Sequence, residues 1–78
     1  MSTNERYRSI VGSALFDVSR NHHTGAHLWV TVGEVANQAG VSRPTARKYL
    51  DILVSQEWAE KIDKGYTVLY MFLEKQEA

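Results

Sequence analysis

Apolar residues recur every three or four positions in the first part of the chain, which is the spacing of a buried helix face. The helix that this spacing predicts begins at Thr3 or Asn4, since either side chain can cap it, and ends near Arg20 or Asn21. Its expected buried stripe consists of Tyr7, Ile10, Val11, Ala14, Leu15 and Val18.

A second, shorter helix is predicted after three apolar residues at 28–30, which indicate a short strand. Thr31 and Glu34 have the spacing of a capping box, in which the hydroxyl accepts from an unpaired backbone N–H and the carboxylate accepts from the Thr31 amide. The helix should cover residues 32–39. Gly40 should end it, because glycine adopts the left-handed conformation easily.

A third helix is expected to begin at Ser42 or Arg43, with Pro44 in its first turn, where a missing N–H costs little. It should end near Gln56. The inward stripe is predicted to contain Ala46, Leu50, Leu53 and Val54, with Tyr49 at its margin.

Two strands should follow, at residues 58–62 and 66–73. Residues 63–65 form the connection between them, with Gly65 supplying a positive φ in a bulged turn. The tail at 74–78 is polar. The resulting order of helix, strand, helix, helix, strand, strand predicts an α+β fold with a three-stranded antiparallel sheet.

Residues 31 to about 73 resemble the winged helix-turn-helix family of DNA-binding domains of the repressor type. Ala36 resembles the small residue at which the two helices cross, Gly40 the turn glycine and Val41 the apolar plug beneath the turn. Residues that match the start of the recognition helix and its core anchors are Ser42, Arg43, Pro44, Thr45, Arg47, Leu50 and Leu53.

The resemblance implies a single domain over residues 1–78, with a helix-turn-helix at about 31–56 and a wing hairpin at about 58–73. Two features depart from the family pattern. Many relatives have glycine near the end of the recognition helix, where this chain has Gln56 and Glu57, and the wing carries a single lysine near its tip.

The resemblance also implies sequence-specific binding of double-stranded DNA by the third helix. An exposed arginine can donate two hydrogen bonds to the O6 and N7 edge of guanine, and hydroxyls at a helix start suit phosphate oxygens. The expected DNA-binding residues are Ser42, Arg43, Pro44, Thr45, Arg47, Lys48, Lys64 and Tyr66. Asp51, one turn beyond Arg47, could orient that arginine, accept from a cytosine amine, or be a charge on the helix surface.

The charge distribution fits a sequence-reading module better than a non-specific nucleic-acid coat, which would be basic throughout. Nine basic and nine acidic residues give a net charge of zero. Residues 42–48, however, contain Arg43, Arg47 and Lys48 and no acid. The neutral charge keeps a rival open, a winged-helix module that binds protein and not DNA. Double-stranded RNA is disfavoured, because its A-form major groove is too narrow for the helix.

A homodimer is expected for two reasons. A chain of 78 residues buries only about 60% of its unfolded surface, so a partner can add stability. The last strand is also apolar on both faces, whereas a solvated face would carry polar residues. One face should join the core and the other, with part of the first helix, should form the dimer. The alternative is that the first helix covers this second face within one chain.

Few other signals in the sequence point to chemistry. His22, His23 and His27 lie in a polar loop at 21–27 with irregular spacing, so we expect no metal site and no cofactor. Neither a Ser–His constellation nor a phosphate-cradling glycine loop is present, which argues against an enzyme. Trp29 and Trp58 are expected to anchor the sheet and the core.

The expected location is the cytoplasm, in association with the nucleoid. The chain has no cysteine, which fits a reducing compartment, and its first residues lack an apolar signal segment. No apolar run approaches the length of a membrane span.

Overall fold

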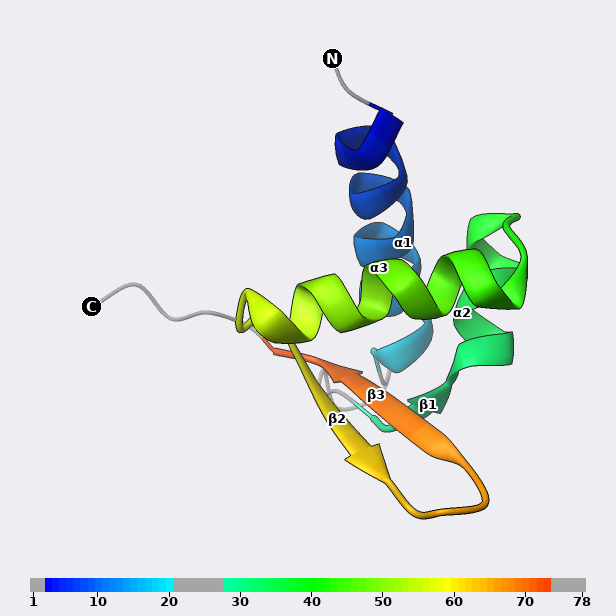
Figure 1. Cartoon of the computed structure of the whole chain (residues 1–78), viewed down its shortest axis with the longest axis vertical. Coiled ribbons are helices and arrows are strands. Elements are labelled where there is room, and N and C mark those ends of the chain that lie inside the picture. The colour runs from blue at the N-terminus through cyan, green and yellow to red at the C-terminus, as the bar shows by residue number, and fades with distance from the viewer. Residues whose placement is uncertain (1–2, 21–27, 74–78) are drawn as a thin grey trace.

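The computed structural model describes residues 3–20 and 28–73, without the side chains of Thr3 and Asn4, and within these residues the predicted order of helices and strands is confirmed. Figure 1 shows the arrangement, in which two helices cross above a twisted hairpin. The elements are α1 (Thr3–Ser19), β1 (Val30–Thr31), α2 (Val32–Ala39), α3 (Arg43–Ser55), β2 (Ala59–Asp63) and β3 (Val68–Phe72).

The apolar stripe of α1 forms one side of the core. Val11 and Leu15 are fully buried, as the helical spacing predicts. Tyr7, expected in the same stripe, is 36% exposed. It lies near the N-terminal end of the helix, where its ring stacks on Tyr49 with centroids 5.7 Å apart. Tyr49, expected at the margin of the α3 stripe, is instead 4% exposed beneath this contact.

The local signals around α2 act as predicted. Thr31 Oγ1 accepts from the Glu34 amide at 3.2 Å, while the Thr31 amide donates to Glu34 Oε1 at 3.3 Å, which completes the capping box. Gly40 ends the helix with φ 71° and donates its N–H to the Ala36 carbonyl. These two ends fix the short helix that supports the turn into α3.

The end of α3 explains one departure from the family pattern. The helix stops at Ser55, and Gln56 follows as its C-cap with φ −93°. Glu57 then adopts φ 63°, the left-handed region that glycine favours and other residues enter at a cost. The chain therefore makes the turn that a glycine would make, with a glutamate in its place.

The sheet has the order β1-β3-β2 with antiparallel neighbours, so β3 is the middle strand. Tyr70, in the centre of β3, pairs with Val30 on one side and Lys61 on the other, and its side chain is fully buried. The hairpin β2–β3 is the wing, and its tip is residues 64–67.

The strands differ in length from those predicted, because turn contacts replace ladder contacts at their ends. Residues 28 and 29 lie outside β1, which instead includes Thr31, and the wing strands end at 63 and resume at 68. The Lys64 amide donates to the Thr67 carbonyl at 2.9 Å, and the Gly65 amide donates to Asp63 Oδ1 at 2.8 Å. Gly65 has φ 85°, as expected.

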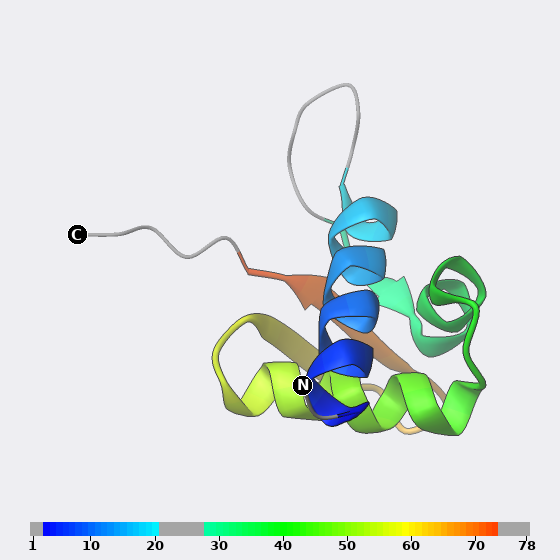
Figure 2. The same cartoon turned by 90° about the horizontal axis from the view of Figure 1, so that it is seen from above.

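One face of the sheet packs on the helices and the other does not. Viewed from above, α1 crosses α3 and passes over β3 (Figure 2), and Phe16 of α1 meets Phe72 edge-on at 5.1 Å. Leu69 and Met71 flank the buried Tyr70 along β3 and therefore point to the opposite face. Since α1 packs on the Tyr70 side, it does not cover this outer face, contrary to one of the alternatives drawn from the sequence.

Neither tryptophan is a core residue, contrary to expectation. Trp29 is 36% and Trp58 40% exposed. Each stands next to a small or β-branched residue that is buried in its place, Val30 and Ala59 respectively. Both tryptophans precede their strands, and the Trp58 ring lies near Phe72 at the edge of the core, with centroids 6.5 Å apart. The fold is the winged helix-turn-helix that the sequence resembles, with α2 and α3 as the helix pair.

Candidate nucleic-acid interface

The start of α3 forms an exposed corner of the molecule. Ser42 caps the helix from an extended conformation, and its Oγ accepts from the Thr45 amide at 3.3 Å and donates to Thr45 Oγ1 at 2.9 Å. Two backbone amides at this helix start are not available to an anion. Pro44 has no N–H, and the Thr45 amide donates to Ser42. The hydroxyls of Ser42 and Thr45 nevertheless lie together at this corner, beside exposed Arg43 and Pro44.

Arg43 and Arg47 lie one turn apart on α3, beside the buried stripe that contains Ala46 and Leu50, and both are exposed. Both side chains line one groove, which runs between α3, the start of α2 and the wing. The residues lining it are Thr31, Val32, Gly33, Arg43, Arg47, Asp63, Gly65, Tyr66, Thr67 and Val68.

Arg43 lies against Gly33 at the edge of this groove, a contact that no pattern in the sequence predicts. A Cβ built on Gly33 would lie 3.2 Å from Nη2 of Arg43 and 3.3 Å from Nε. The guanidinium therefore packs against the first turn of α2, so closely that a side chain at position 33 would push it by a few tenths of an ångström. This contact joins the two helices of the helix-turn-helix at their exposed ends.

The remaining predicted contacts do not all lie together. Tyr66 is 85% exposed and lines the groove, and Lys64 is exposed beside it at the wing tip. Lys48 is exposed on another side of α3, with Nζ 5.6 Å from the centroid of the Tyr49 ring. It borders a depression shared with Arg8 of α1 and does not border the groove.

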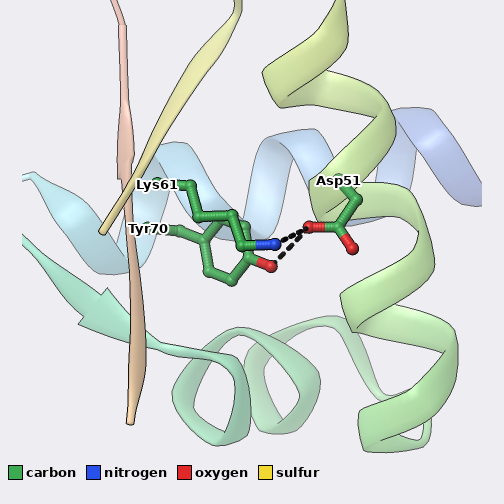
Figure 3. A network of polar contacts seen from close by, with 3 residues as sticks. All are labelled: Asp51, Lys61 and Tyr70. Carbon is green, nitrogen blue, oxygen red and sulfur yellow. Dashed lines mark hydrogen bonds and ion pairs between the residues drawn. The ribbon is translucent and has the colours of Figure 1, made fainter. Parts of the chain in front are cut away.

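Asp51 is not an isolated charge on the helix surface but connects α3 to the sheet (Figure 3). Its Oδ1 accepts from the Tyr70 hydroxyl at 2.6 Å and from Lys61 Nζ at 3.2 Å. Lys61 and Tyr70 are direct cross-strand partners, and Lys61 Nζ lies 5.9 Å from the centroid of the Tyr70 ring. The network thus draws together α3, β2 and β3.

These contacts set the protonation of the network. Partial burial alone would raise the pKa of Asp51, but the hydrogen bonds from Tyr70 and Lys61, with the charges of Lys61 and Arg47, bring that pKa below its ordinary value. Burial and the neighbouring carboxylate raise the pKa of the Tyr70 hydroxyl. Near neutral pH the carboxylate is therefore charged and the phenol neutral, which is the pair of states that the hydrogen bond requires.

Other possible sites are limited. His22, His23 and His27 lie outside the described residues, so the structure says nothing of their predicted lack of a metal. Within residues 3–20 and 28–73, no group of three His, Cys, Asp or Glu side chains is placed to hold a metal ion. None of the helices described is both long and apolar enough to cross a membrane.

The chain belongs to a family of unknown function (DUF7342), whose sequence profile matches residues 24–78. No curated protein sequence matches it. A solved structure titled "Protein structure of Type III plasmid segregation TubR" is similar to it, with a TM-score of 0.64 and 14% sequence identity. The match covers 95% of this chain and 76% of that chain. At this identity the likeness supports the winged helix-turn-helix fold.

Proposed function

We propose that this protein binds double-stranded DNA by placing the start of α3 in the major groove. The observation that carries the proposal is that Arg43 and Arg47 are both exposed and line one groove with the wing and the start of α2. The major groove, about 12 Å wide, admits a helix of about 10–12 Å diameter. An arginine at its floor can read guanine with two hydrogen bonds.

The other predicted residues would fix the protein on the phosphate backbone. The corner that carries the Ser42 and Thr45 hydroxyls and Pro44 would enter the DNA major groove first, where phosphate oxygens flank the helix. Lys64 and Tyr66 extend from the wing toward the same duplex. Lys48 lies outside the groove of the protein that Arg43 and Arg47 line, and it would contact a more distant phosphate as a point charge.

A role on DNA is also supported by what the structural neighbour is called. Its title names plasmid segregation, and a plasmid is a DNA molecule. For this chain we infer a small transcription regulator that acts in the cytoplasm, at the nucleoid. It would act by occluding other proteins or through a partner.

We infer that the protein acts as a homodimer through the outer face of its sheet. Ile62, which pairs with Leu69, is 37% exposed, and Leu69 and Met71 are partly exposed beside it. Burying this apolar surface away from water is favourable. A second copy is the partner that brings a second basic helix start. Two such starts on half-sites about one helical turn apart would strengthen binding.

The rival function is a winged-helix module that binds another protein. It is favoured by the net charge of zero and by the same apolar outer face. The two functions differ in their response to salt. Four to six basic residues in phosphate contact predict that log K falls with log salt concentration at a slope of roughly 4 to 5 per copy.

A duplex selected from a random pool tests the proposed function. We expect saturable binding in a fluorescence titration, weakening steeply with salt, and a preference over a shuffled duplex of the same composition. Selection that enriches no sequence, with no binding to any duplex at low salt, would overturn DNA binding and leave the protein-binding module.

A further inference from the structure

Arg47 and Asp51 stand four residues apart on α3, a spacing at which opposite charges on a helix normally interact. In this structure one oxygen of the Asp51 carboxylate, Oδ1, is bonded to Tyr70 and Lys61 (Figure 3). Among the described residues 28–73 the ion pair of Asp51 is with Lys61 and not with Arg47. Arg47 instead lines the groove beside Arg43.

We propose that Tyr70 and Lys61 hold the Asp51 carboxylate away from Arg47 and so keep that guanidinium available to DNA. Tyr70 and Lys61 are then positioning residues, because they touch no DNA and act through Asp51 on Arg47. The first half of the inference concerns the free protein. The second half rests on the proposed function.

The competition between the two arrangements has a clear physical basis. The Tyr70 ring is fully buried in the middle strand, so its hydroxyl is already fixed and loses little freedom by bonding. Arg47 is exposed and long, so pairing with Asp51 would cost it several freely rotating bonds. The nearby Lys61 ammonium, 3.2 Å from Oδ1, offsets the carboxylate charge as well.

Removing Lys61 reverses this balance. The carboxylate, 44% exposed at its side chain, keeps its charge but loses its ion pair, and Arg47 is the cation one turn away on the same helix. We expect Arg47 to turn toward Asp51 in Lys61→Met, and more completely in Lys61→Met with Tyr70→Phe. An arginine held in this way must break the pair before it can reach a base.

The free protein gives the first test. The Arg47 Nε–Hε signal in a ¹H–¹⁵N spectrum should shift in Lys61→Met and return to its wild-type position when Asp51→Asn is added. Arg43→Ala and Arg47→Ala assign the two groove arginines, and Lys64→Met, which removes a lysine from the same wing, should leave the signal in place. An Arg47 signal unmoved by Lys61→Met, or one that Asp51→Asn does not restore, overturns the proposal.

Binding to the selected duplex gives the second test. Lys61→Met should weaken binding about two- to fivefold, as expected for an exposed ion pair of this kind. The same change should have no effect in an Asp51→Asn background or in an Arg47→Ala background, because the interfering pair cannot form there. If Lys61 only stabilised the fold, Asp51→Asn would not restore the DNA affinity lost in Lys61→Met, and the Tm of Lys61→Met would differ from that of wild type.

Two other results have definite meanings. An equal loss from Lys61→Met in all three backgrounds would show that Lys61 contacts DNA itself, which contradicts the proposal. If wild type binds no duplex, the proposed function fails, and the spectrum of the free protein alone decides whether Asp51 is held away from Arg47.

Discussion

The guanidinium of Arg43 lies against the backbone of Gly33, so close that a methyl group at position 33 would meet Nη2 at 3.2 Å. This contact links the first turn of α2 with the first turn of α3. Because Arg43 is exposed on its other side, the glycine determines where the guanidinium stands without burying it. Gly33 therefore shapes the proposed interface although it offers no side chain to it.

Gly33→Ala should separate stability from DNA binding. Alanine favours a helix more than glycine does, by up to about 1 kcal/mol, and the atoms it would crowd belong to the end of a flexible side chain. We expect a Tm equal to or above that of wild type, with a small loss of DNA affinity because the Arg43 guanidinium must shift by a few tenths of an ångström. A calorimetric scan and a binding titration measure the two effects. Unchanged affinity would mean that the position of Arg43 does not matter for binding.

Glu57→Gly should stabilise the protein. Glu57 has φ 63°, a conformation that costs a non-glycine residue about 1 kcal/mol, and its side chain is exposed. The relief is partly offset by the greater freedom of glycine in the unfolded chain, so we expect a gain of about 0.5 to 1 kcal/mol in the free energy of unfolding. Urea denaturation measures it.

The neighbouring residue supplies a matched control for this turn. Gln56 has φ −93°, which any residue adopts, so Gln56→Gly should destabilise the protein. Equal effects of the two glycine substitutions would contradict the assignment of strain to Glu57.

Tyr70→Phe tests the bond between sheet and helix. The ring stays in the core while the bond to Asp51 is lost, so we expect a loss of about 1 to 2 kcal/mol, the lower end being favoured by the solvent exposure of Asp51. The pKa of Asp51 is lowered in the folded protein. Its stabilising effect is therefore present above the ordinary value near 3.8 and lost as the pH falls through the folded pKa.

The stability lost in Tyr70→Phe should depend on pH. The stability difference between wild type and Tyr70→Phe, measured by urea denaturation, should be largest near neutral pH and should narrow in acid. A difference that stays constant from pH 7 down to pH 2 would show that the hydroxyl stabilises the protein through some group other than the Asp51 carboxylate.

The proposed dimer should dissociate when a charge enters the outer face of the sheet. Leu69→Lys places an ammonium beside Ile62 and Met71, where a second copy would bury it without a partner. We expect sedimentation to show a dimer for wild type and a monomer for this variant. Ser13→Lys adds the same charge to an exposed position on α1 and should remain dimeric. A wild-type protein that stays monomeric at high concentration would contradict the proposed dimer.

What the sequence predicts well is set by neighbours within one turn. The Thr31–Glu34 capping box and the left-handed Gly40 depend on residues three or four positions apart, and the structure confirms both. Of the two predicted starts of the third helix, Ser42 or Arg43, the structure has Ser42 as the cap. The spacing of apolar residues likewise identifies the buried positions Leu15 and Leu50.

What it predicts poorly depends on partners distant in the chain. Asp51 looks like a surface charge until β3 brings Tyr70, nineteen positions later, to its carboxylate. Tyr49 is 4% exposed where Tyr7 of α1 stacks on it, and Trp58 stays 40% exposed beside Phe72 of β3. Gly33 gives no signal, since its importance comes from the contact with Arg43.

The affinity of the arginine variants for the selected duplex tests the central claim most directly. We expect Arg43→Ala and Arg47→Ala each to weaken binding by about 1 to 3 kcal/mol and to relax the preference at a guanine, with Tm unchanged because both side chains are exposed. Arg6→Ala, which removes an exposed arginine from α1, should bind like wild type. Wild-type affinity and sequence preference in both groove variants would contradict the account.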